Sequence, residues 1–79
     1  MTEKLKNMMC ILGPEGDTKI TWDPVSENEI EVARKEFDDY MTKNYSAYTV
    51  DNNGKKGVKL TSFNPFVGKI ILVPPVTGG

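Results

Sequence analysis

The sequence contains no histidine and a single cysteine, Cys10. One thiol cannot form an internal disulfide, and a metal site built from cysteine and histidine ligands is excluded. Histidine is also the side chain that most often transfers protons in catalysis, so its absence argues against general acid–base chemistry. Cys10 lies between Met9 and Ile11 in an apolar run, where a thiol is expected to be a small buried hydrophobe and not a nucleophile. We therefore expect no enzyme activity, no bound metal and no bound cofactor.

Long apolar runs and an excess of charge of one sign are also missing. No stretch approaches the ~20 apolar residues of a membrane span, and no apolar run of signal-peptide length follows the charged residues 1–7. Ten basic and eleven acidic residues give a net charge of −1, which offers no long-range attraction for phosphates or anionic lipids. We expect a cytoplasmic protein that binds neither a membrane nor a nucleic acid.

The chain has enough apolar residues for one small core. It has 79 residues, of which 38% are hydrophobic and 27% are charged, as expected for a single domain. Residues 8–12 form an apolar run that a Gly- and Pro-rich turn separates from residues 18–23. Ile20 and Trp22 alternate there with polar residues, the period of a strand with one buried face. The pattern predicts a first hairpin with Trp22 in the core.

A helix is predicted to begin at Ser26. Ser26 and Glu29 fit a capping box, in which the Ser26 hydroxyl accepts from the Glu29 amide while Glu29 reaches back, and Val25 is placed to pack onto Ile30. Asn44 suits the left-handed residue that closes such a helix. The apolar stripe is expected at Ile30, Ala33, Phe37 and Met41, with Val32 and Tyr40 on its flanks. The many acidic residues of the helix are interpreted as a solvated surface and not as a catalytic carboxylate pair.

Three further strands are predicted after the helix. Residues 45–50 and 58–63 read as a hairpin joined by the Asn- and Gly-rich residues 51–57, which lack the spacing of a phosphate-binding loop. A turn at residues 64–68 leads to residues 69–73, whose apolar run suits a central strand and must end at Pro74. The order of two strands, a helix and three strands predicts an α+β domain with one helix on a small mixed sheet.

The last residues, Pro-Pro-Val-Thr-Gly-Gly, combine stiffness with small size. Pro74 and Pro75 restrict the backbone, so the chain is expected to leave the domain as a stiff arm. Gly78 and Gly79 have no Cβ and can enter a channel too narrow for other residues. If the diglycine ends the protein, as we expect, its carboxylate is sterically open. Such residues also occur in frayed termini, so a purely passive end is the alternative.

Residues 70–79 resemble the end of the small subunit of molybdopterin synthase and of related ubiquitin-like sulfur carriers, which finish on a strand, Pro-Pro-Val, a small residue and Gly-Gly. The resemblance implies a ubiquitin-like β-grasp fold (ββαβββ), with residues 1–7 as a polar leader, 8–73 as the domain and 74–79 as the tail. It also implies a partner, an adenylating enzyme of the ubiquitin-activating type. That enzyme would use ATP to activate Gly79, which then becomes a thiocarboxylate or is joined to a lysine.

The same resemblance assigns a role to each residue of the tail. Gly78 and Gly79 would enter the partner's active site, and Pro74 and Pro75 would direct the arm. Val76 and Thr77 would contact the channel.

A second resemblance leads to a different class of function. The run from Gly16 to Pro24, the following helix, Phe63-Asn64-Pro65 and the Pro-Pro-Val-Thr-Gly-Gly end are also similar to small uncharacterised proteins of bacteriophages and mobile elements. This resemblance implies a non-enzymatic structural or interaction module. The tail would then be a docking peptide or a passive terminus.

Overall fold

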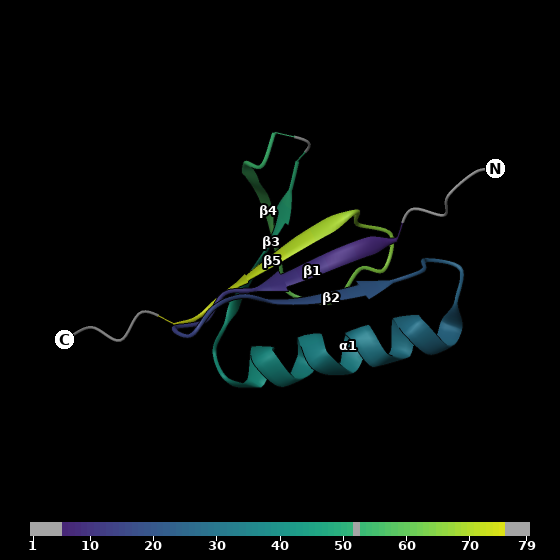
Figure 1. The fold of residues 1–79 in the computed structure, drawn as a ribbon, viewed down its shortest axis with the longest axis horizontal. Helices are drawn as coiled ribbons and strands as arrows, with labels where there is room; N and C mark the ends of the chain where they lie inside the picture. The colour runs from purple at the N-terminus through teal and green to yellow at the C-terminus, as the bar shows by residue number, and fades with distance from the viewer. Residues whose placement is uncertain (1–5, 52, 76–79) are drawn as a thin grey trace.

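The computed structural model of the chain describes residues 6–51 and 53–75. In this part of the chain one helix packs on one face of a five-stranded sheet (Figure 1). The elements are β1 (Asn7–Ile11), β2 (Thr18–Trp22), α1 (Glu27–Thr42), β3 (Ser46–Val50), β4 (Lys56–Leu60) and β5 (Lys69–Val73). The predicted α+β class and the order of elements are confirmed.

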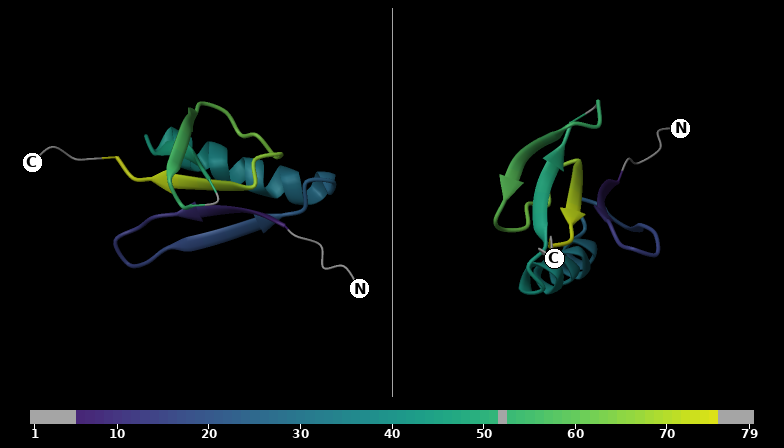
Figure 2. Two further views of the ribbon diagram at one scale, coloured as in Figure 1. Left: turned by 90° about the horizontal axis from the view of Figure 1, so that it is seen from above. Right: turned by 90° about the vertical axis from the view of Figure 1, so that its left-hand side faces the viewer.

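The sheet is mixed, with the strand order β2-β1-β5-β3-β4. β1 and β5 run parallel at its centre, and pairing of Met9 with Ile70 sets their register. All other neighbours are antiparallel. The predicted central position of the last strand is therefore confirmed, because β5 lies between β1 and β3. Figure 2 shows the twisted sheet from above and from one end, with α1 crossing a single face.

The core lies between this face and α1. Every second residue of the central strands points into it, as the period of a strand requires. The residues that are completely buried are Met9, Trp22, Ala33, Phe37, Ala47, Ile70 and Leu72, and Ile11 is 3% exposed. The Trp22 ring contacts Phe63 edge to face, and its Nε1 donates to the Pro65 carbonyl over 2.9 Å. The predicted core role of Trp22 is confirmed.

The start of α1 follows the prediction only in part. Ser26 is the N-cap, and its Oγ accepts from the Glu29 amide at 3.4 Å. Glu29 does not reach back to Ser26, however: its Oε1 accepts from the Asp23 amide at 2.9 Å, while the Ser26 amide donates to the Asp23 carbonyl. The predicted packing of Val25 on Ile30 is wrong, because Val25 is 75% exposed. The hydrogen bond from the Asp23 amide to the Glu29 carboxylate therefore connects α1 to the end of β2.

The other end of α1 and its apolar stripe agree better with the sequence. Asn44 has the predicted left-handed conformation, with φ of 67°. Ala33 and Phe37 are buried, and Ile30, Tyr40 and Met41 pack partly buried against the core. Val32 lies outside the stripe and is 62% exposed.

The strand boundaries differ from the predictions by one to three residues at several ends. The largest difference is at β4, which is Lys56–Leu60 and not residues 58–63. Thr61 to Gly68 form the connection to β5 instead, where Asn64 Oδ1 accepts from the Phe66 amide at 2.9 Å. β5 ends at Val73, directly before Pro74, as predicted.

Candidate functional site

The predicted tail follows β5, the central strand of the sheet. Val73 pairs with Ser46 of β3, and on the other side of β5 the Leu72 carbonyl accepts from the Leu12 amide at 3.0 Å. Pro74 is half-buried against the domain, whereas Pro75 is exposed. The predicted site residues Val76, Thr77, Gly78 and Gly79 lie outside the described residues. The described structure thus places the first two tail residues at the end of a strand that is held on both sides.

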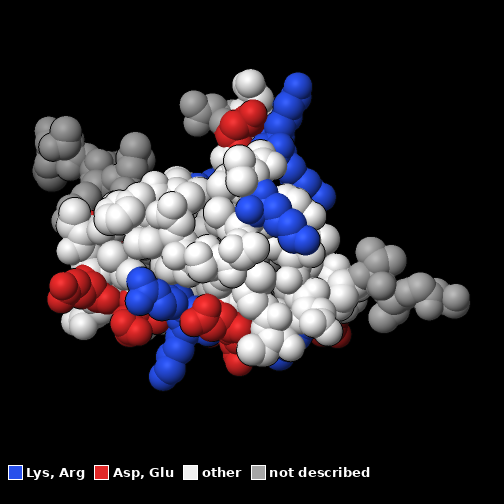
Figure 3. Space-filling model, turned by 180° about the vertical axis from the view of Figure 1, so that it is seen from behind, with Lys and Arg blue, Asp and Glu red and all other residues white. Residues whose placement is uncertain are grey.

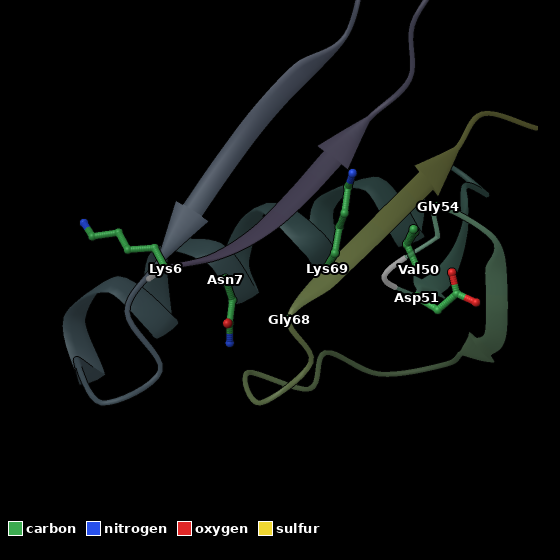
Figure 4. A pocket seen from close by; sticks show the side chains of 7 residues that line it. All are labelled: Lys6, Asn7, Val50, Asp51, Gly54, Gly68 and Lys69. Carbon is green, nitrogen blue, oxygen red and sulfur yellow. The ribbon is translucent and has the colours of Figure 1, made fainter. Parts of the chain in front are cut away.

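A surface depression lies at the opposite end of β5. Its volume is about 600 Å³, and it is lined by Lys6, Asn7, Val50, Asp51, Gly54, Gly68 and Lys69 (Figure 4). Figure 4 shows that Lys69 and Val50 point to the same side, whereas Asn7 points away from them. A five-residue strand spans roughly 17 Å, so the depression and Pro74 are separated by the length of β5. A partner at one of these places does not have to cover the other.

Three polar side chains in this depression are already engaged within the domain. Asn7 Nδ2 donates to the Pro65 carbonyl at 2.8 Å. Asp51 Oδ1 accepts from the amides of Asn53 and Lys55, both at 2.9 Å. Lys6 Nζ lies 3.1 Å from Glu29 Oε1. These contacts stabilise the loop and the start of α1, and they leave the depression without a set of convergent groups for a ligand.

Glu29 is an ionisable residue whose proton affinity is changed by its environment. Hydrogen bonding from the Asp23 amide, followed by the contact with Lys6, lowers the pKa of Glu29 below its usual value of 4.5. Donors near a carboxylate favour its charged form. Glu29 therefore has a structural role as an ionised cap, and the structure does not poise it as a proton donor near neutral pH.

The chemistry-bearing residues that the sequence analysis considered do not come together in the described structure. Cys10 is half-buried in β1 and is not part of the core, so the expectation of a buried thiol is only partly met. No group of three Asp, Glu, Cys or His side chains among the described residues could hold a metal ion. Likewise, no helix in that part of the chain is long and apolar enough to cross a membrane.

The structure also assembles a surface that the sequence analysis missed. Strand pairing aligns Lys19 with Cys10, Cys10 with Ile71, Ile71 with Tyr48, and Tyr48 with Lys59. These residues alternate with the core residues, so they lie on the face of the sheet away from α1. We call this row, with the residues two positions away on the same strands, the open sheet face. Its members come from five separate segments, so no local sequence pattern could have revealed it.

Comparison with protein-family models, with curated proteins and with solved structures finds no match to this chain.

Proposed function

We propose that the chain is a ubiquitin-like carrier or modifier with a β-grasp fold. A partner enzyme activates the carboxylate of its Gly79. The ββαβββ order, the single helix across one face and the central last strand support this fold. They are the features that the resemblance of residues 70–79 leads one to expect.

One observation carries the proposal: the tail follows the central strand of the sheet directly. Because β5 is paired with β1 and β3 along its length, the position of Val73 is set by the whole domain. Pro74 and Pro75 each restrict φ to about −65°, so the direction of the chain at this point is restricted as well. This combination would present a narrow arm to a partner at a defined place.

In this proposal the partner enzyme catalyses the activation of Gly79. A free carboxylate is a poor electrophile, so an oxygen of the Gly79 carboxylate first attacks the α-phosphorus of ATP, and pyrophosphate leaves. A hydrosulfide ion then attacks the acyl-adenylate to give the thiocarboxylate, or a lysine amine attacks it to give the amide, and AMP leaves in either case. In this scheme Gly78 and Gly79 enter the active site, Val76 and Thr77 contact its channel, and Pro74 and Pro75 orient the arm.

Mass spectrometry tests the proposal in two stages. The intact mass of the protein isolated from its host shows whether Gly79 carries the terminal carboxylate and whether it is modified. The full chain is then incubated with an adenylating enzyme from the same genome and ATP, and an adenylate, a thiocarboxylate or a lysine conjugate is expected at Gly79. A chain without Gly79 should not react, whereas a Lys35→Ala control should react like the original. Equal modification of the truncated chain would refute the proposal.

An interaction module without tail chemistry is the second candidate, and the open sheet face favours it. In this alternative the tail is a docking peptide or passive, and the protein acts through its surface alone. Neighbouring genes for an activating or sulfur-transfer enzyme would support the first candidate. Neighbouring virion or replication genes would support the second.

A further inference from the structure

The open sheet face is a continuous surface with an apolar centre. Cys10, Ile71 and Tyr48 occupy its middle row and are half-buried, whereas Met9 and Ile70, on the opposite face, have no exposed area. The uncovered side chains therefore keep part of their apolar surface in contact with water. Partly exposed apolar residues with a polar rim make this face a candidate binding surface.

Lysines surround this apolar centre, and the strands provide no acidic residue to neutralise them. Lys19, Lys56, Lys59 and Lys69 are the only charged residues in the five described strands. Lys19 and Lys59 stand at the two ends of the middle row, on the outer strands β2 and β4. Lys56 Nζ lies 5.1 Å from the centre of the Tyr48 ring, which shows that it reaches over the same face.

The negative charge is concentrated on the other layer of the molecule. α1 contains six acidic and two basic residues, a net charge of −4, against four positive charges on the strands. Figure 3 shows acidic side chains, with basic ones among them, along the side of the molecule formed by α1, and lysines next to an acidic side chain near the β3–β4 hairpin. The overall charge of −1 therefore conceals two layers of opposite sign.

We propose that the open sheet face binds a partner protein whose contact surface has apolar side chains surrounded by aspartate and glutamate. An apolar centre with a charged rim is the usual arrangement of a protein interface. The lysine rim would select an acidic partner and speed its association. This inference does not depend on the chemistry of the tail.

A nucleic acid fits this surface less well than a protein. Single-stranded nucleic acids bind by stacking bases on aromatic rings and by extensive phosphate contacts. Tyr48 is the only aromatic residue of the face, and Lys56 lies over its ring.

A second copy of the chain also fits less well. Its acidic layer is α1, and Val32 is the one exposed large hydrophobic residue of that helix. One valine cannot cover an apolar centre that spans three strands, β1, β5 and β3.

The size of the surface sets the expected strength of binding. Five strands about 4.8 Å apart and about 17 Å long offer roughly 400 Å². Stable interfaces bury about 800 Å² on each partner. We therefore expect transient binding that weakens as salt is added.

Two synthetic peptides of 18 residues provide the test. Both carry leucines at helical spacing. In the acidic peptide the positions beside the leucines are glutamate, and in the basic peptide they are lysine. Titrated into the ¹⁵N-labelled full chain, the acidic peptide should shift the amide signals of Cys10, Tyr48 and Ile71. It should also slow the alkylation of Cys10, the chain's only thiol. The basic peptide should do neither.

Charge-reversal variants test the role of the lysine rim. Lys19→Glu with Lys59→Glu should weaken binding of the acidic peptide at least about tenfold. The control, Arg34→Glu with Lys35→Glu, makes the same change of charge at exposed residues of α1, on the other side of the sheet, and should change the affinity less than about twofold. Thermal unfolding of both variants establishes that they are folded.

Several results would overturn the proposal. Equal losses in the two variants, equal binding of the basic peptide, or shifts confined to α1 would show that the face is not selective. Tighter binding of a single-stranded oligonucleotide at the same residues would assign the face to nucleic acid. Concentration-dependent shifts of α1 and the face together, without peptide, would assign it to a second copy.

Discussion

At the scale of single residues, Glu29 connects three parts of the chain. Its own amide donates to Ser26, its Oε1 accepts from the Asp23 amide, and Lys6 lies 3.1 Å from the same oxygen. It thus joins the start of α1 to the end of β2 and to the residue before β1. A capping carboxylate normally serves only its own helix, whereas this one also positions α1 relative to the sheet.

Replacing Glu29 by glutamine should make folding stability less dependent on pH. Because the pKa of Glu29 is lower in the folded than in the unfolded chain, folding favours the charged form. This stabilisation is fully present above the usual value of 4.5 and is lost as the pH falls through the lowered pKa. Urea midpoints of the original and the Glu29→Gln chain should therefore differ at pH 7 and converge as the pH falls below the lowered pKa of Glu29. Glu31→Gln, at an exposed position of the same helix, is the control. A constant difference at all pH values would contradict the assignment.

Gly57 is a residue whose role became visible only in the structure. It lies in β4 beside an irregularity in the pairing with β3. A Cβ at Gly57 would overlap the Thr49 hydroxyl. That hydroxyl also accepts from the Val58 amide at 2.9 Å, so it cannot turn away without losing this bond.

Gly57→Ala should therefore reduce the free energy of unfolding by about 1–3 kcal/mol, the usual cost of forcing extra atoms into a packed place. Gly68→Ala is the matched control, because a Cβ there has no atom within 4 Å. It should change the stability by less than about 0.5 kcal/mol. Chemical denaturation of both variants measures the difference. Equal effects would show that β4 adjusts without cost.

At the scale of elements, β5 separates stability from binding on its two faces. Ile70 and Leu72 are completely buried under α1, while Ile71 faces the open side and is half-buried. Burial of apolar area is the main source of stability. The strand's inward residues should therefore control folding, and its outward residue should control recognition.

Leu72→Ala and Ile71→Ala should rank oppositely in two assays. Leu72→Ala should cost about 2–5 kcal/mol, as expected for a fully buried leucine. This is a large share of the roughly 4–12 kcal/mol available to a domain of this length. Ile71→Ala should cost about 1 kcal/mol but weaken binding of the acidic peptide severalfold. Urea unfolding and the peptide titration are the measurements. If both variants lost stability equally, the face would be part of the core.

The elements themselves could be predicted because their signals are local. The run at Lys69–Val73, the cap at Ser26 and the left-handed Asn44 each depend on a few adjacent residues, and all three agree with the structure. The pairing of β1 with β5 could not be derived in this way, because Met9 and Ile70 are far apart in the sequence. Two local details were also wrong: Glu29 Oε1 accepts from the Asp23 amide and not from Ser26, and Val25 is exposed.

The two candidate sites also differ in whether their residues are adjacent in the sequence. The tail could be recognised because it is a contiguous motif. The open sheet face could not be recognised, because its lysines lie on different strands. Their positive charge is also offset by the acidic residues of α1, so it does not appear in the net charge of −1.

At the scale of the whole molecule, the domain has two opposite layers and an end that leads away from its central strand. The sheet carries the positive charge and α1 the negative charge. The tail begins at Pro74, beyond the last strand pairing at Val73. Folding, recognition and tail chemistry therefore depend on different residues, and a single truncation can separate them.

Removal of residues 76–79 should leave the fold and the open sheet face intact while abolishing modification by an adenylating enzyme. The core of the described residues includes none beyond Leu72, so the thermal midpoint should change by less than about 2 °C, well below the roughly 4–8 °C that 1 kcal/mol produces in a small domain. Binding of the acidic peptide should be unchanged. Truncation after Ile71 also removes Leu72 and Val73, and this control should not fold. A large drop in the midpoint on removal of residues 76–79 would show that the tail is part of the domain, and the carrier proposal would then lose its physical basis.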